Sequence, residues 1–125
     1  MKEEIKRWTN QAYADLKSAK HSLKSKDYYL SAFMCQQAVE KILKAFYLKK
    51  YGKLRKIHDL AYFARKLSLS EDLIEKCEEL TKAYIETRYP DLGSGEIPAK
   101  KFSKDDAKKF LKIALEVLKC IKKMM

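Results

Sequence analysis

The most apolar long stretch of the chain is residues 28–48, YYLSAFMCQQAVEKILKAFYL. Apolar side chains recur there at steps of three and four residues, which is the period of an α-helix. On a helical wheel they cover about half of the circumference, so such a helix needs neighbours on several sides. The apolar set is Ala32, Met34, Cys35, Ala38, Val39, Ile42, Leu43, Ala45 and Phe46. We therefore expect a helix over about residues 27–51 at the centre of the fold.

The remaining face of this expected helix is polar. It carries Gln36, Gln37, Glu40, Lys41 and Lys44. Glu40 and Lys44 have the i,i+4 spacing of a stabilising ion pair on a helix. A polar strip ordinarily faces solvent. On a helix that is otherwise so apolar, we expect the strip to face a crevice or a partner subunit.

The flanking segments predict further helices. Helical periodicity covers about residues 2–24, and the following KSKD leaves room only for a tight turn, so the next helix must run back antiparallel. Gly52 stands where a left-handed residue would end that helix. After it comes the basic segment GKLRKIHD, and the HDL at residues 58–60 begins a short helix with Asp59 near its start.

The second half of the chain predicts two long helices separated by a loop. Ser70 can cap a helix that runs to about Tyr89, because Pro90 disfavours helical geometry at the residue before it. Ser103 and Asp106 have the spacing of a capping box that opens the last helix. Residues 90–102 are expected to form one long irregular loop. The fold class is therefore all-α: an antiparallel up-and-down four-helix bundle with one additional short helix, in a single domain over residues 1–125.

Arg88 is placed unusually for a charged residue. On the wheel it belongs to the apolar stripe of its helix, one turn beyond Tyr84, and it precedes the loop that holds both prolines. An inward arginine needs an anionic partner, because an unpaired buried charge costs several kcal/mol. That partner is either an internal carboxylate or a phosphate or carboxylate of a ligand. The candidate internal carboxylates are Asp15, Glu40 and Asp59.

The composition bounds the function. The chain has 125 residues, 36% of them charged, and a net charge of +11, which suggests an anionic partner or else high solubility and adaptation to heat. No apolar run approaches the roughly 20 residues that span a bilayer, and the N-terminus lacks the apolar core of a signal peptide, so a cytoplasmic protein without membrane contact is expected.

Cys35, Cys77 and Cys120 are expected to be reduced and buried. With only His21 and His58 available, no metal site is predicted.

His58 itself allows two interpretations. A histidine just before a helix usually packs or bonds locally, but it can also bind a phosphate or act as an acid or base. Neither a serine nor a cysteine motif stands nearby, so no nucleophilic constellation and no catalytic residue is assigned.

Three segments in combination resemble a known family. QQAVEK in the central helix, HDL at the start of the short helix, and YIETRYPD before the loop are similar to the HEPN domain (higher eukaryotes and prokaryotes nucleotide-binding). The resemblance covers nearly the whole chain. It implies an antiparallel helical bundle, often a homodimer, that is frequently encoded beside a minimal nucleotidyltransferase as a toxin–antitoxin or substrate-binding pair. No cofactor is implied. Some members are metal-independent ribonucleases that use an arginine followed, after four to six residues, by a histidine, and this chain lacks that motif.

The resemblance thus implies a binding role for a nucleotide, RNA or a nucleotidyltransferase partner. Its candidate residues are Arg88, Tyr89, His58, Lys41, Lys44 and Gln37. Two other functions stay open: a ribonuclease toxin, disfavoured by the missing motif, and non-specific nucleic-acid binding through surface lysines. A homodimer is also expected from the residues, because one small bundle can hardly cover both the central helix and the many tyrosines.

Overall fold

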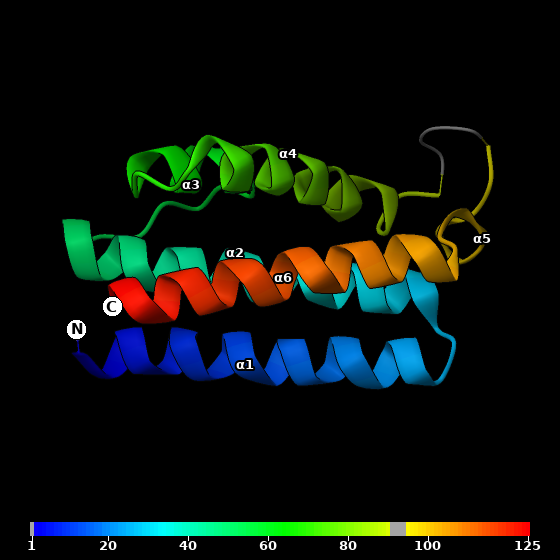
Figure 1. Cartoon of the computed structure of the whole chain (residues 1–125), viewed down its shortest axis with the longest axis horizontal. Helices are drawn as coiled ribbons and strands as arrows, with labels where there is room; N and C mark the ends of the chain where they lie inside the picture. The colour runs from blue at the N-terminus through cyan, green and yellow to red at the C-terminus, as the bar shows by residue number, and fades with distance from the viewer. Residues whose placement is uncertain (1, 91–94) are drawn as a thin grey trace.

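The computed structural model describes residues 2–90 and 95–125, and these residues form helices that pack along one another (Figure 1). No strand occurs in these two ranges. The helices are α1 (Lys2–Lys24), α2 (Tyr28–Tyr51), α3 (Leu60–Lys66), α4 (Glu71–Glu86), α5 (Pro98–Lys101) and α6 (Lys104–Met124). Along the chain, α1, α2, α4 and α6 alternate in direction, so the expected all-α antiparallel bundle is confirmed.

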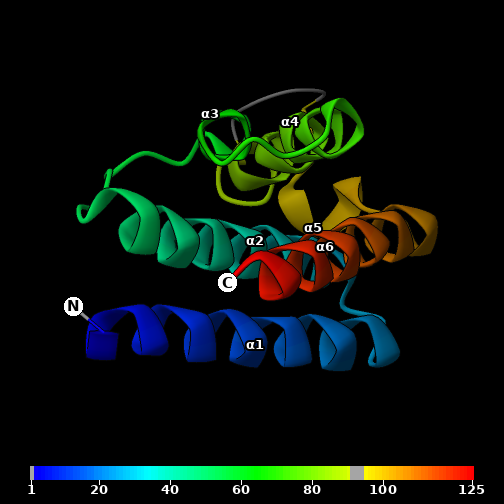
Figure 2. The same cartoon turned by 60° about the vertical axis from the view of Figure 1, so that its left-hand side comes forward.

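Helix α2 is the central element, as its apolar circumference predicted. Figure 2 shows α1 on one side of it, α6 beside it, and α3 and α4 on the other side. The side chains of Val39, Ile42 and Leu43 are almost completely buried in the core that these helices share. Helix α2 contacts each of the other long helices, α1, α4 and α6.

The predicted helix ends are confirmed where a local signal defines them. Gly52 closes α2 with a φ of 73°, in the left-handed region that favours glycine. The side chains of Asp59 and Ser70 accept hydrogen bonds from backbone N–H groups in the first turns of α3 and α4. Ser103 and Asp106 form the reciprocal capping box at the start of α6.

The end of α4 differs from the prediction. The helix ends at Glu86, with Thr87 as its C-cap, rather than near Tyr89. The backbone N–H groups of Arg88 and Tyr89 both return to the carbonyl of Ile85, in a turn beyond the helix. Arg88 is therefore exposed, and the prediction that it continues the inward stripe is wrong. A helical wheel assumes that the helix continues, whereas this chain leaves regular helical geometry before it reaches Arg88.

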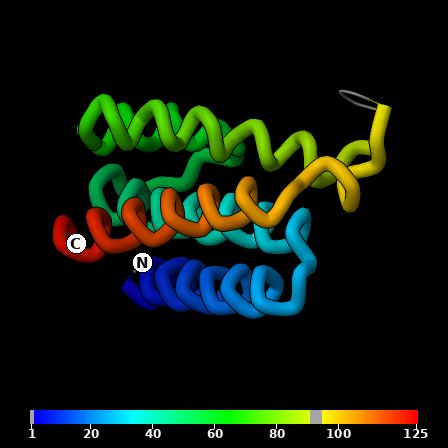
Figure 3. Tube along the Cα trace, turned by 45° about the vertical axis from the view of Figure 1, so that its right-hand side comes forward, coloured from blue at the N-terminus to red at the C-terminus, as the bar shows by residue number. Residues whose placement is uncertain are grey.

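The segment expected to be one irregular loop contains the short helix α5. Pro98 opens α5, at the position where its fixed φ and missing N–H are tolerated. Figure 3 shows this turn at the end of the bundle where α4 ends and α6 begins. Residues 91–94, which include Gly93 of the predicted loop, lie outside the described residues.

Two of the three cysteines are buried, as expected. Cys35 and Cys77 are free thiols in the core, and burial raises the pKa of each to about 12. Cys120 is also free but only half-buried, so the prediction of burial is wrong there. It lines a surface groove between α4 and α6, where the two helices leave part of their apolar sides uncovered.

Candidate ligand-binding site

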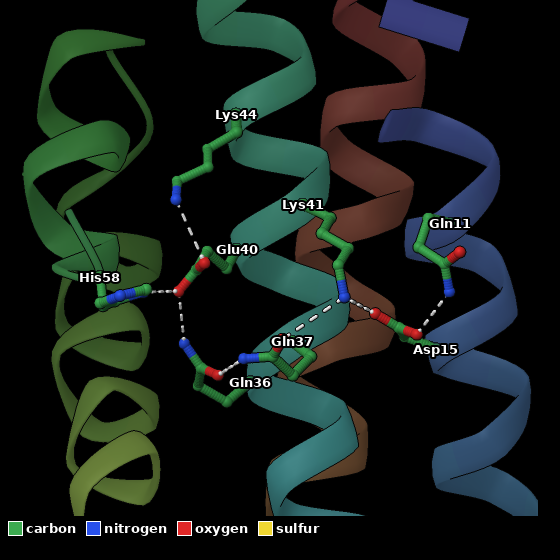
Figure 4. A network of polar contacts seen from close by, with 8 residues as sticks. All are labelled: Gln11, Asp15, Gln36, Gln37, Glu40, Lys41, Lys44 and His58. Carbon is green, nitrogen blue, oxygen red and sulfur yellow. Dashed lines mark hydrogen bonds and ion pairs between the residues drawn. The ribbon is translucent and has the colours of Figure 1, made fainter. Parts of the chain in front are cut away.

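The polar strip of α2 is largely buried and forms one hydrogen-bonded network (Figure 4). Gln36 is completely buried, and Glu40 and Lys44 are each 6% exposed. The strip lies between α1 and the segment that carries His58. It therefore faces neighbouring elements of the same chain rather than open solvent, and buried polar groups of this kind must satisfy one another.

Glu40 is the first centre of the network. Its carboxylate accepts hydrogen bonds from Gln36 Nε2 at 3.0 Å, Lys44 Nζ at 3.2 Å and His58 Nδ1 at 2.9 Å. Burial alone would raise the pKa of this carboxyl. The hydrogen bonds from His58 and Gln36 and the charge of Lys44 together outweigh burial and hold the pKa below its ordinary value. Glu40 thus stays ionised and orients the His58 imidazole.

Asp15 of α1 is the second centre. It is 4% exposed, accepts a hydrogen bond from Gln11 Nε2 at 2.9 Å, and forms an ion pair with Lys41. Gln37 joins the two centres, because its amide donates to Gln36 Oε1 at 2.7 Å and its carbonyl accepts from Lys41 Nζ at 3.4 Å. A continuous chain of hydrogen bonds therefore runs from α1 across α2 to His58.

An exposed cluster adjoins this network at His58. The imidazole stacks on the ring of Tyr84, with ring centroids 4.3 Å apart and an interplanar angle of 17°. The guanidinium of Arg88 lies 4.6 Å from the same Tyr84 ring centroid and 5.6 Å from that of Phe33. The His58 side chain is 47% exposed. Tyr84 therefore brings a histidine and an arginine from distant parts of the sequence into one solvent-accessible group, the Tyr84 cluster.

None of the three internal carboxylates binds Arg88. Asp15 and Glu40 are held by the partners described above, and Asp59 caps α3. Within residues 2–90 and 95–125, Arg88 forms no ion pair, and its contacts are the faces of the two aromatic rings. The guanidinium also borders a surface pocket of about 290 Å³. The pocket is lined by Tyr29, Leu30, Phe33, Thr87 and Arg88.

The sequence-predicted site residues fall into three positions. His58 and Arg88 meet at Tyr84. Gln37, Lys41 and Lys44 belong to the network, in which Lys44 lies near His58 whereas Lys41 lies at the α1 end (Figure 4). Tyr89 is 45% exposed and follows Arg88 in the turn.

Sequence reasoning did not select two of the residues that organise the cluster and the network. Tyr84 was assigned only to the apolar stripe of its helix, and Asp15 only to the candidate partners of Arg88. The spacing of Tyr84 and Arg88 at i,i+4 is a signal for a ring–guanidinium contact. No local signal predicts that His58 stacks on the same ring, since this contact joins distant segments.

Two other classes of site are absent from the described part of the chain. No helix there is long and apolar enough to cross a membrane. The same residues contain no group of three or more His, Cys, Asp or Glu side chains that could hold a metal ion.

Together these features define an all-α bundle whose central helix carries an internal polar network that ends at an exposed Arg–aromatic–His cluster. The chain belongs to the HEPN family: the model of the HEPN domain matches residues 5–124. The resemblance of the three sequence segments to this family is thereby confirmed.

Similar proteins include one from Methanocaldococcus jannaschii named "Putative toxin MJ1304", 33% identical over 130 residues that cover 94% of this chain and 85% of that protein. Among solved structures, TT1696 from Thermus thermophilus superimposes with a TM-score of 0.90 at 30% identity, covering 97% of this chain and 98% of that chain. ST0689, an archaeal HEPN homologue, superimposes with a TM-score of 0.79 at 26% identity, covering 96% of each chain.

Proposed function

We propose that this HEPN-family protein is a binding module that takes a nucleotide at the Tyr84 cluster. The observation that carries the proposal is the shared position of His58 and Arg88 against Tyr84, with no carboxylate of the described residues occupying the guanidinium. Tyr89, next to Arg88 in the chain, is also exposed. A nucleotide offers two groups that fit the side chains of the cluster: an anionic phosphate and a flat base.

The chemistry of the cluster suits both groups. The Arg88 guanidinium can form two parallel hydrogen bonds to a phosphate, which a lysine cannot reproduce. The neighbouring pocket of about 290 Å³ has Phe33 and Tyr29 in its wall, and aromatic faces stack well on bases. His58 is held by Glu40 through Nδ1, which leaves its other ring nitrogen free for the ligand. The net charge of +11 attracts anions to the whole surface.

In this proposal, the polar network supports the Tyr84 cluster through Lys41, Lys44 and Gln37. Lys44 is buried and bonded to Glu40, so it holds the carboxylate that orients His58. Lys41 and Gln37 fix the far end of the same chain of hydrogen bonds. These residues therefore position His58 rather than touch the nucleotide at the Tyr84 cluster.

We also infer that the protein forms a homodimer and a complex with a minimal nucleotidyltransferase, in a toxin–antitoxin-like or substrate-binding role. The name of the Methanocaldococcus relative supports the toxin-like part of this inference. Exposed apolar side chains on several elements, such as Tyr13, Tyr51 and Leu115, support further protein contacts.

Calorimetric titration with ATP tests the nucleotide site. Arg88→Ala should remove the binding event of the Tyr84 cluster from the titration, and Arg88→Lys should not restore it, because an ammonium lacks the planar fork. Both variants should unfold within about 1 kcal/mol of the wild type, since the lost contacts are exposed cation–π contacts. Lys82→Ala removes an exposed charge from α4 and serves as the matched control. An equal loss of binding in Lys82→Ala would instead support non-specific attraction by surface lysines.

A ribonuclease activity is the second candidate, and one observation favours it. The His58 imidazole pairs with a buried carboxylate beside an arginine, an arrangement that can activate a hydroxyl. The family's Arg–His spacing is absent from the sequence, so we rank this candidate lower. Incubation with labelled RNA in the absence of metal distinguishes the two. We expect no cleavage; cleavage that disappears in His58→Ala would make the protein a ribonuclease.

A further inference from the structure

A second pocket lies at the α1 end of the polar network, away from His58. It has a volume of about 340 Å³, within the range of small-ligand sites, and is lined by Arg7, Trp8, Gln11 and Lys41. Figure 4 shows Gln11 and Lys41 on the side of the network opposite His58. None of the residues that form the Tyr84 cluster lines this pocket, so the pocket is a separate place on the molecule.

Two of the lining side chains are held in fixed positions with unused hydrogen-bonding capacity. The Lys41 ammonium is bound by Asp15 and Gln37, and an ammonium has three N–H donors. The Gln11 amide donates one hydrogen bond to Asp15, which leaves its carbonyl oxygen and a second N–H available. Because Asp15 is itself buried, these groups are preorganised at the pocket rather than free to follow a ligand.

The other two lining side chains supply charge and a flat surface. Arg7 is exposed and forms no hydrogen bond or ion pair with any described residue. Trp8 is half-buried, and the Lys44 ammonium lies 5.8 Å from its ring centroid. Lys44 is fixed by Glu40, so the indole ring is held by a group that is itself anchored. The two cations that line the pocket are Arg7 and Lys41. The Asp15 carboxylate, which pairs with Lys41, offsets one of these charges, so the net charge at the pocket is positive.

We infer that this pocket is a second, separate binding site for a small flat molecule that carries a phosphate, of the class of nucleoside monophosphates. The base packs against Trp8 and pairs with the Gln11 amide, while the phosphate binds Arg7 and the remaining donor of Lys41. A flat ring without an anion, or an anion without a ring, uses only half of these groups. The inference does not depend on nucleotide binding at Arg88.

The fluorescence of Trp8 provides the test, because Trp8 is the one tryptophan in the chain. Titration with adenosine monophosphate should change the emission of the full-length protein in a saturable way. Adenosine and ribose 5-phosphate should each bind at least about tenfold more weakly, because each lacks one of the two recognised groups. Arg7→Ala should weaken the binding of adenosine monophosphate about tenfold or more, since it removes a charge-assisted hydrogen bond.

Two variants separate this site from its alternatives. Lys6→Ala removes an exposed charge next to Arg7 in the sequence and should leave the affinity unchanged. Arg88→Ala should also leave it unchanged, so failure of the Tyr84 cluster and failure of this pocket give different results. The inference is overturned by an absence of saturable change, by equal losses in Lys6→Ala and Arg7→Ala, or by a loss in Arg88→Ala alone. Arg7 makes no hydrogen bond or ion pair with the described residues, so Arg7→Ala should have the same melting curve as the wild type. A matching curve will show that the fold of the variant is intact.

Discussion

At the scale of single residues, Glu40 decides how the candidate site is built. Three donors converge on this buried carboxylate, and one of them is the exposed His58. The Lys44 ammonium is buried beside it and depends on it for compensation of charge. The same residue therefore links the stability of the bundle to the orientation of a side chain of the proposed nucleotide site.

The lowered pKa of Glu40 predicts how stability depends on pH. Because the folded pKa lies below the ordinary 4.5, the ionised carboxylate contributes its full stabilisation above about pH 4.5. That contribution is lost as the pH falls through the lower folded value. Urea unfolding of the wild type and of Glu40→Gln between about pH 7 and pH 3 measures this directly. We expect the stability difference between the two proteins to shrink in acid, and a difference that stays constant would contradict the prediction.

The sequence predicted His58 and Arg88 as candidate residues but not how they meet. Their residue types, their positions in the chain and the resemblance to the HEPN family together selected them. The wheel placed Arg88 inside, whereas the structure exposes it on the faces of Tyr84 and Phe33. Such contacts depend on how the segment before α3 packs on α4, and no periodicity within one helix encodes that packing.

At the scale of helices, the elements with local signals were predicted well. The start of α6 is defined by the Ser103 hydroxyl, the Asp106 carboxylate and their backbone partners, all close together in the sequence. The end of α4 and the existence of α5 were missed, since both depend on how the chain crosses between two packed helices. Short-range capping is visible in a sequence, but the path of a connection is fixed by packing.

The capping box gives a prediction at this scale. Ser103→Ala should lower the free energy of unfolding by about 1 kcal/mol, because a backbone N–H in the first turn of α6 loses its acceptor. Asp106→Ala should cost a similar amount, and the double variant should cost less than the sum, since each residue supports the other. Lys108→Ala, an exposed change in the same helix, is the control and should stay within about 0.5 kcal/mol. Full additivity in chemical denaturation would show that the box does not act as a unit.

At the scale of the whole molecule, the helices form three layers that expose different surfaces. Helix α1 forms one outer layer, α2 with α6 the middle, and α3 with α4 the other outer layer (Figures 1 and 2). The pocket that contains Trp8 lies between α2 and α1. The pocket that contains Arg88 lies between α2 and the end of α4. Apolar side chains also remain exposed on several helices, among them Tyr13 on α1 and Leu115 on α6.

These exposed side chains support a second copy of the chain as a partner. Light scattering at micromolar concentration should give about twice the 14.7 kDa of one chain. We expect this mass to persist at high salt, because apolar contacts are not screened. A mass of one chain under both conditions would contradict the homodimer.

The most direct measurement maps the nucleotide onto the protein. In a titration of the isotope-labelled protein with ATP, followed by NMR, the largest chemical-shift changes should fall on His58, Tyr84 and Arg88. They should disappear in Arg88→Ala, whose spectrum should otherwise match the wild type. Changes confined to the lysine-rich outer face of α6, or no saturable change at all, would contradict the proposal that the Tyr84 cluster is the nucleotide site.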